Sequence, residues 1–285
     1  MIEPAVSIAV GIANAPGSYA FLLGAGVSRS AGIPSGEGVL TELIRQVAIA
    51  NSAEIPEDER TWFSATYDQA PTYSTVLEDL SDTTSGRSDL LRPFFEASEE
   101  DRENGRKVPT TAHRAIAHLV SAGHIRLILT TNFDTLVEDA LTSVGITPTV
   151  VRGSRDVSGM RPLGRDPCMV IKIHGDYRDT ATLNTPGELS EYPSAMQELL
   201  HRVFTEYGII IVGWSAESDV ALTAAMRHAP RRYPWFFTAR GDLRPEAQSL
   251  VADCGIQVAA LPTQTNSAAS CRGRLKLSSG FPFTL

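Results

Sequence analysis

Residues 21–35 are Phe21-Leu22-Leu23-Gly24-Ala25-Gly26-Val27-Ser28-Arg29-Ser30-Ala31-Gly32-Ile33-Pro34-Ser35. The hydrophobic run from Tyr19 to Leu23 predicts a strand, and a helical pattern follows over about residues 38–50. A strand that enters a helix through a glycine-rich turn brings backbone N–H groups and the positive helix end together, which favours an anion site, most often for phosphate. Glycine at positions 24 and 26 lets the backbone approach a ligand, because a Cβ atom there would block it. A tight turn that binds nothing explains the glycines equally well.

The spacing of this loop differs from two common phosphate-binding motifs. Arg29 occupies the position of the third glycine in G-x-G-x-x-G, and Gly32 comes later, followed by Ile33 and Pro34. No Gly-Lys-Ser or Gly-Lys-Thr follows, as a Walker motif requires. If the loop binds phosphate, it is therefore not an ordinary dehydrogenase or nucleoside-triphosphatase loop.

Composition limits the classes of protein. The chain has 285 residues, 42% of them hydrophobic, which suits one large domain or a domain with an inserted subdomain. A formal net charge of −8 argues against wholesale nucleic-acid binding. Cys168, Cys254 and Cys271 lie far apart without a C-x-x-C pair, which supports neither a zinc ribbon nor a disulfide framework and fits a reducing cytoplasm. We expect a cytoplasmic protein without a metal, a signal peptide or a membrane-spanning segment.

Strand and helix patterns alternate along the rest of the chain. Further strands are predicted at residues 126–130, 147–151, 170–173, 208–212, 234–238 and 256–260. Helical patterns lie between them. This alternation predicts an α/β fold with a Rossmann-like, mostly parallel sheet and helices on both faces.

One segment departs from the alternation. Residues 51–109 carry aromatic and aliphatic residues on short helical patterns, and we interpret them as a helical insertion subdomain whose charged run 98–107 is a solvated loop. The sheet domain that holds this insertion is predicted to occupy residues 1–262. Residues 263–285 have no clear period and are predicted to be a flexible tail or a truncation boundary.

Four of the predicted strands end in small or polar clusters. These clusters are Gly24-Ala25-Gly26, Asn132-Phe133-Asp134, His174-Gly175-Asp176 and Gly213-Trp214-Ser215. In an open α/β sheet the ligand crevice lies outside the carboxyl ends of the strands, so the clusters should converge there. Taken singly, Asp134 and Asp219 fit helix caps, His174 fits a structural histidine and Asp176 fits loop structure. Taken together, the clusters favour a ligand with phosphates and ribose hydroxyls.

The motifs G-A-G-V-S-R-S-A-G-I-P-S, T-N-F-D, I-H-G-D and V-G-W-S occur in this order between residues 19 and 260. In this combination the chain resembles the sirtuin-like family, which binds NAD on a Rossmann-like sheet. The resemblance implies that Asn132 and Asp134 face the nicotinamide ribose and carboxamide and that His174 is the catalytic histidine. It also implies a set of cofactor-binding residues. These are Gly24, Ala25, Gly26 and Ser28 at the diphosphate, Ile33 and Pro34 at the nicotinamide side, Thr131, and Gly213 and Ser215 at the phosphate and adenosine side.

Three departures from the family pattern indicate which branch of the sirtuin-like family the chain resembles. The four-cysteine zinc module of protein-deacylating sirtuins cannot be built here, Pro34 is followed by Ser35-Gly36-Glu37 in place of D-F-R, and T-N-F-D replaces Q-N-I-D. These features resemble the bacterial sirtuin-like domains of antiphage systems, which hydrolyse NAD. The resemblance therefore implies an NAD hydrolase that acts as an abortive-infection effector, with NAD as its substrate and no metal.

Two alternatives remain open at this stage. One is an NAD-dependent deacylase or ADP-ribosyltransferase, and the other is a module that binds NAD or ADP-ribose without turnover. By resemblance, we also expect a homo-oligomer or a regulatory sensor domain or subunit. In the hydrolase, Asn132 would place the attacking water, His174 would accept its proton, and Asp134 would hold the carboxamide or offset the developing positive charge.

Overall fold

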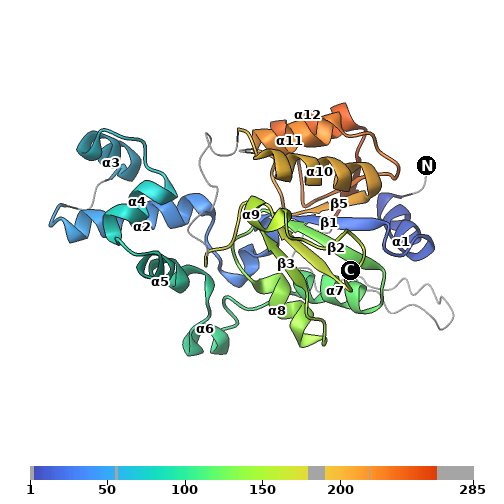
Figure 1. Ribbon diagram of the computed structural model, residues 1–285, viewed down its shortest axis with the longest axis horizontal. Coiled ribbons are helices and arrows are strands. Elements are labelled where there is room, and N and C mark those ends of the chain that lie inside the picture. The colour runs from blue at the N-terminus through green and yellow to red at the C-terminus, as the bar shows by residue number, and fades with distance from the viewer. Residues whose placement is uncertain (1–2, 55–56, 179–189, 218, 262–285) are drawn as a thin grey trace, which may run out of the picture.

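The computed structural model describes residues 3–54, 57–178, 190–217 and 219–261. Figure 1 shows a sheet with helices on both faces, and a group of helices that extends from one end of it. The predicted tail at 263–285, which includes Cys271, lies outside the described residues.

The sheet contains seven parallel strands in the order β3-β4-β2-β1-β5-β6-β7. Their bounds are Tyr19–Leu23 (β1), Ile125–Thr130 (β2), Thr149–Arg152 (β3), Met169–Lys172 (β4), Gly208–Val212 (β5), Phe236–Ala239 (β6) and Gln257–Ala260 (β7). β2, β4 and β3 lie on one side of β1, and β5, β6 and β7 lie on the other, so the chain changes direction across the sheet between β1 and β5. The predicted fold class is confirmed, and β1 is buried throughout because both faces of the sheet are covered.

Three helices cover each face of the sheet. Alternate residues of β1 separate the two cores: Ala20 and Leu22 pack on one side, and Tyr19, Phe21 and Leu23 pack on the other. The first face is covered by α10 (Ser194–Glu206), α11 (Val220–His228) and α12 (Pro245–Cys254). The second is covered by α1 (Pro4–Asn14), α7 (Thr111–Ser121) and α8 (Leu136–Ser143).

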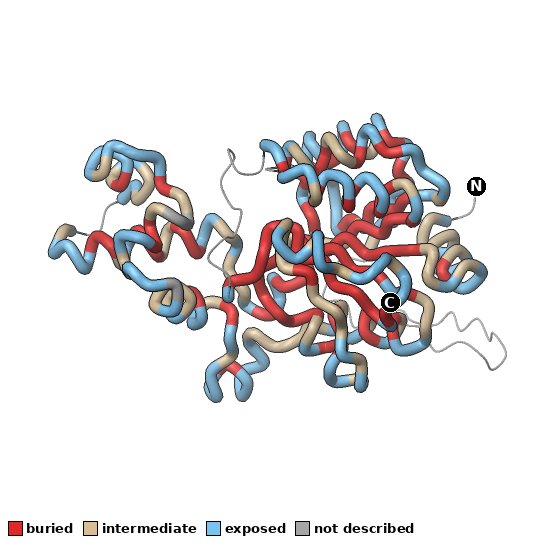
Figure 2. Tube along the Cα trace, in the orientation of Figure 1, coloured by how far each residue is buried: buried red, intermediate tan, exposed pale blue. Residues whose placement is uncertain are grey.

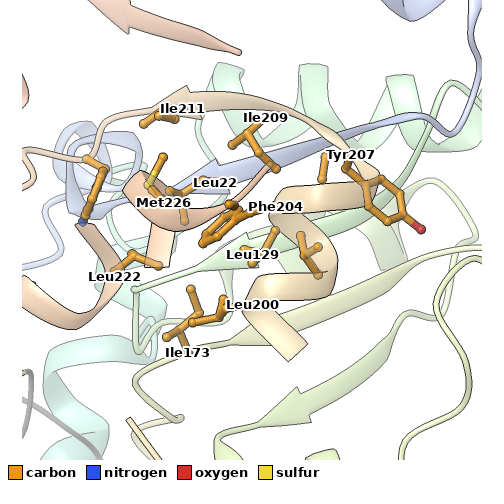
Figure 3. Close-up of a cluster of buried hydrophobic side chains, with 14 of the residues drawn as sticks. Leu22, Leu129, Ile173, Leu200, Phe204, Tyr207, Ile209, Ile211, Leu222 and Met226 are labelled. Carbon is orange, nitrogen blue, oxygen red and sulfur yellow. The ribbon is translucent and has the colours of Figure 1, made fainter. Parts of the chain in front are cut away.

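Figure 3 shows the first of these cores, where the side chains of α10 and α11 meet the strands. Phe204 and Leu200 of α10 lie against Leu22 and Leu129, and all four side chains are fully buried. A short helix that the sequence pattern did not reveal, α9 (Ser154–Val157), follows β3 and contacts α10. The strand ends are thus held on a closely packed, rigid support.

The remaining helices form a subdomain with a core of its own (Figures 1 and 2). They are α2 (Gly36–Ala50), α3 (Glu59–Tyr67), α4 (Tyr73–Leu80), α5 (Thr84–Phe95) and α6 (Glu99–Glu103). α2 buries Leu40, Leu43 and Ile44 against α3 and α4 instead of the sheet. The helical packing therefore begins at Gly36, earlier than the boundary at residue 51 that the sequence suggested. The subdomain core is joined to the sheet domain through Phe133 and Tyr177.

The expectation of a solvated loop at 98–107 is wrong over its first half, where the chain forms α6. Ser98 and Asp101 form a reciprocal capping box at the start of this helix. Asp101 is buried, with its Oδ2 2.9 Å from Lys107 Nζ and its Oδ1 3.0 Å from Arg106 Nε. The hydrogen bond from Lys107 and that from the backbone of Ser98 lower the pKa of Asp101 to about 2. Neutralisation by these neighbours explains how a strongly charged run adopts a folded conformation.

Within the described ranges, no helix combines the length and apolarity needed to cross a membrane. The same residues contain no group of three or more His, Cys, Asp or Glu side chains arranged to hold a metal ion.

Candidate functional site

The glycine loop after β1 packs directly on the loop after β5. Gly24 N donates to Val212 O at 3.0 Å, and Gly26 N donates to Gly213 O at 2.8 Å. A Cβ atom on Gly24 would lie 2.5 Å from the Cα of Trp214, and one on Gly26 would lie 2.8 Å from Gly213 O. The neighbouring loop therefore requires glycine at both positions. This close packing accounts for the glycines in the way that the sequence analysis gave as the alternative to ligand binding.

The loop also differs from the predicted strand–turn–helix anion site. It forms two short 3-10 turns, Ala25–Val27 and Arg29–Ala31, and α2 begins only at Gly36. The N–H groups of Val27 and Ser28 donate to carbonyl groups within the loop. A phosphate at this place would therefore face the exposed residues Ala25 and Gly26, of which the Gly26 N–H already donates to Gly213 O, and not the N-terminus of α2.

Asn132 lies at the end of β2 and points back to the glycine loop. Its Nδ2 donates to Gly24 O and to Ser28 Oγ, both at 3.2 Å, and its backbone N–H donates to Thr130 Oγ1 at 3.0 Å. The carbonyl of Gly24 can only accept, which fixes the orientation of the amide. Asn132 Oδ1 is then buried without a hydrogen-bond partner in the described part of the chain. Because buried polar atoms are nearly always paired, this oxygen is the acceptor that remains for a bound hydroxyl or water.

Ser28 is held in turn by a histidine that the sequence reasoning did not select. Thr110 N donates to His113 Nδ1 at 3.1 Å, so the proton of the neutral ring is on Nε2, which lies 3.5 Å from Ser28 Oγ. Burial lowers the pKa of His113, against an opposing effect of the Asp134 charge. His113 is also the third residue of a capping box that begins at Thr110, and this motif is the sequence signal for its fixed position.

His174 follows β4, the strand next to β2 in the sheet. Ile173 N donates to Thr130 O at 2.9 Å, so Asn132 and His174 follow the ends of neighbouring strands. Both are 8% exposed. The partners of His174 are not the other predicted site residues but Tyr192 and Asp219, which are described below.

Two buried residues contact the His174 ring. Its Nε2 lies 2.7 Å from Asp219 Oδ2 and 3.1 Å from the Tyr192 hydroxyl, and that hydroxyl donates to Asp219 Oδ2 at 2.6 Å. Burial and the charge of Asp219 raise the pKa of Tyr192, which keeps it protonated. Asp219 also caps α11, as the sequence suggested, because its Oδ1 accepts from Leu222 N at 2.9 Å. Tyr192 stands outside any sequence motif, so only the fold could reveal it.

Asp134 lies just before Thr135, the N-cap residue of α8, and its Oδ1 accepts from Leu136 N, the first residue of that helix, at 3.0 Å. The backbone around it is held by Lys172, which is fully buried at the end of β4. Lys172 Nζ donates to Phe133 O at 3.0 Å, to Asp134 O at 2.7 Å and to Asp176 Oδ2 at 2.9 Å. A buried cation thus anchors the main chain of the T-N-F-D segment, and Asp176 is its counter-ion.

The other predicted cofactor-binding residues have fewer contacts with the group of Gly24, Ser28 and Asn132. Thr131 N donates to Leu23 O at 3.0 Å, which ties the start of the T-N-F-D segment to β1. Ile33 packs against the core of the helical subdomain, and Pro34 beside it is half-buried. Ser215 lies exposed on the loop after β5. The structure therefore groups Gly24, Ser28 and Asn132 tightly and leaves Ile33, Pro34 and Ser215 at the periphery.

A cavity of about 410 Å³ lies between the helical subdomain and the start of α8. Its wall combines aromatic, basic and acidic side chains, among them Tyr177, Arg178, Lys107, Glu96 and Asp139. None of the predicted site residues lines it. The cavity is therefore not the predicted crevice, although its lining residues Pro109 and Thr135 lie close in sequence to Thr110 and Asp134.

Residues 126–259 match the family model of the SIR2-like domain. The matched stretch runs from β2 to β7 and includes the T-N-F-D, I-H-G-D and V-G-W-S segments. A search of curated proteins gives no match. A structure from a study of the mechanism and regulation of Sir2 enzymes has a TM-score of 0.47 and 16% identity, over 90% of this chain and 92% of the other. A Sir2 homolog in complex with NAD has a TM-score of 0.45 and 18% identity, over 89% and 88%.

Proposed function

We propose that the protein is an NAD hydrolase that cleaves the bond between nicotinamide and ribose to give nicotinamide and ADP-ribose. The observation that carries the proposal is the buried, unpartnered Oδ1 of Asn132 in the described structure, beside the glycine loop and one strand away from His174. Such an acceptor is suited to a water or a ribose hydroxyl. The SIR2-like domain across residues 126–259 includes both side chains.

Cleavage needs little acid catalysis, because the nicotinamide ring of NAD is already cationic and leaves as neutral nicotinamide. The electron pair of the C1′–N bond moves to the ring nitrogen, and a water oxygen forms the new bond to C1′ through an oxocarbenium-like transition state. Asn132 Oδ1 orients the water or a ribose hydroxyl, and His174 accepts the proton that the water loses. The carboxylate of Asp134, buried at the same strand end, adds negative charge near the developing cation.

We assign the binding roles by the resemblance of the motifs. Ala25 and Gly26, which are exposed, and Gly213 and Ser215 on the neighbouring loop are assigned to the diphosphate and adenosine side. Ile33, Pro34 and Thr131 border the nicotinamide side. We assign the cellular role, an antiphage effector working as an oligomer or under a regulatory sensor, by the resemblance of the motifs. Loss of cellular NAD on phage infection, absent in cells that carry Asn132→Ala, is its test.

The decisive experiment follows nicotinamide release from NAD by the full chain without an acyl-lysine acceptor. Wild type should release nicotinamide, and Asn132→Ala should lose turnover while remaining folded. Asn104→Ala is the matched control, because Asn104 is exposed at the C-cap of α6 and its side-chain amide donates to Glu100 O of that helix. Release at the wild-type rate by Asn132→Ala would refute the assignment. NAD binding without turnover would favour the sensing module, and turnover that requires an acyl-lysine peptide would favour the deacylase.

A further inference from the structure

The buried cluster of His174, Tyr192 and Asp219 goes beyond the motif that predicted the histidine. Asp219 is 3% exposed, and no lysine or arginine forms an ion pair with it in the described part of the chain. Its carboxylate receives three hydrogen bonds. Oδ1 accepts from Leu222 N, and Oδ2 accepts from the Tyr192 hydroxyl and from His174 Nε2. Both oxygens are therefore fixed in direction.

These contacts determine which ring nitrogen of His174 carries the proton. The Asp219 carboxylate can only accept a hydrogen bond. The Tyr192 hydroxyl donates its one hydrogen to Asp219, so only its lone pairs can face the His174 ring. Nε2 of His174 therefore faces two acceptors, and the neutral ring must carry its hydrogen there. The nitrogen left to accept a proton is Nδ1.

We propose that Asp219 is a positioning residue that holds His174 in the Nε2–H tautomer, so that Nδ1 is the proton acceptor in NAD hydrolysis. The inference rests on the proposed function for its kinetic consequence only. When Nδ1 takes the proton from water, the ring becomes an imidazolium whose Nε2–H remains bonded to the Asp219 carboxylate. The negative charge of Asp219 stabilises that cation, and the role of the carboxylate ends there, because no proton passes to it.

Asp219→Asn tests the tautomer with little change of shape. The cap fixes how the asparagine amide lies: its oxygen must face the donor Leu222 N, so its NH₂ group must face His174 Nε2. Nε2 then becomes the acceptor, and the ring proton moves to Nδ1. Tyr192→Phe is the control variant, because it removes the hydroxyl and leaves the pair of His174 and Asp219 intact.

The first readout needs no substrate. Long-range ¹H–¹⁵N correlation spectra of the full chain, with His174 assigned by His174→Gln, should show the Nε2–H tautomer in wild type and Tyr192→Phe, and the Nδ1–H tautomer in Asp219→Asn. An Nδ1–H ring in wild type, or an unchanged ring in Asp219→Asn, would overturn the proposal. If wild type releases no nicotinamide, the proposed function fails while the tautomer assignment is still decided by these spectra.

The second readout separates positioning from general support of the fold. In Asp219→Asn, kcat for nicotinamide release should fall by about 10²–10⁴, the usual contribution of a general base, with little change in KM for NAD. Tyr192→Phe, which keeps the Asp219 carboxylate on His174 Nε2, should lose less of kcat than Asp219→Asn. A raised KM with an unchanged kcat in Asp219→Asn would show that the carboxylate serves binding, and it would overturn the positioning role.

Discussion

Removing the buried ammonium group of Lys172 tests whether it anchors the T-N-F-D segment. In Lys172→Met, three hydrogen bonds from Nζ are lost, and the carboxylate of Asp176 remains with a side chain that is 1% exposed. Among the described residues, the ion pair that remains to Asp176 is with Arg152, whose Nε lies 3.6 Å from Asp176 Oδ2 and whose side chain is 40% exposed. Arg152 therefore neutralises the charge of Asp176 only in part.

The magnitude follows from the uncompensated charge. Breaking a buried ion pair by removing one partner costs about 3–5 kcal/mol of the free energy of unfolding. Glu138 adds to the cost, because Lys172 Nζ lies 3.4 Å from its Oε1. Burial raises the pKa of Glu138, and the Lys172 charge opposes that rise. At about 2–4 °C per kcal/mol, the expected fall in Tm is about 6–20 °C.

The assay is urea denaturation of wild type, Lys172→Met, Asp176→Leu and the double variant. The double variant should be more stable than the sum of the single losses predicts, since it leaves no unpaired charge. Arg202→Met is the control, because its pair with Glu206 is 55% and 42% exposed and should change stability by less than about 0.5 kcal/mol. A loss below about 1 kcal/mol in Lys172→Met would refute the anchoring role.

Two further perturbations address the loop contact and the buried histidine. Gly26→Ala should destabilise the fold by about 1–3 kcal/mol in thermal unfolding, because its Cβ would lie 2.8 Å from Gly213 O. The control Gly38→Ala, whose Cβ would make ordinary contacts, should be neutral or slightly stabilising. Equal effects of the two variants on stability would contradict the packing argument. Burial lowers the pKa of His113 below its unfolded value, so the unfolded state binds the extra proton and the free energy of unfolding should fall as the pH drops below about 6.5. His113→Gln should weaken this pH dependence and the exposed control His201→Gln should keep it, and equal slopes in His113→Gln and wild type would count against the assignment.

The fold could be predicted well because its signals are local. Apolar runs such as 208–212 are long enough to identify buried strands, and the β1 and β5 loops carry their glycines in sequence. Parallel pairing places the carboxyl ends of all strands at one edge, so Asn132 and His174 could be assigned to the same edge of the sheet before any coordinates. That their strands are neighbours is known only from the structure.

The parts that the sequence did not reveal depend on contacts across long separations. Tyr192 and His174 are 18 residues apart and Asp219 is 45 residues from His174, so no spacing rule links them. α2 has an ordinary amphipathic pattern that fits either a sheet or a helical partner, and only the packing of α3 and α4 decides between them. Lys172 is the last residue of β4 and is fully buried, although lysine side chains are seldom buried unless they are paired. Its partners on the T-N-F-D backbone come from another part of the chain.

The central claim is that water cleaves the nicotinamide–ribose bond at the strand ends that hold Asn132 and His174. Its most direct test is to incubate the full chain with NAD in ¹⁸O-labelled water and to analyse the products by mass spectrometry. The account predicts unlabelled nicotinamide and ADP-ribose with one ¹⁸O atom at C1′ from wild type, and neither product from Asn132→Ala. Intact NAD with wild type, or the same labelled ADP-ribose from Asn132→Ala, would contradict it.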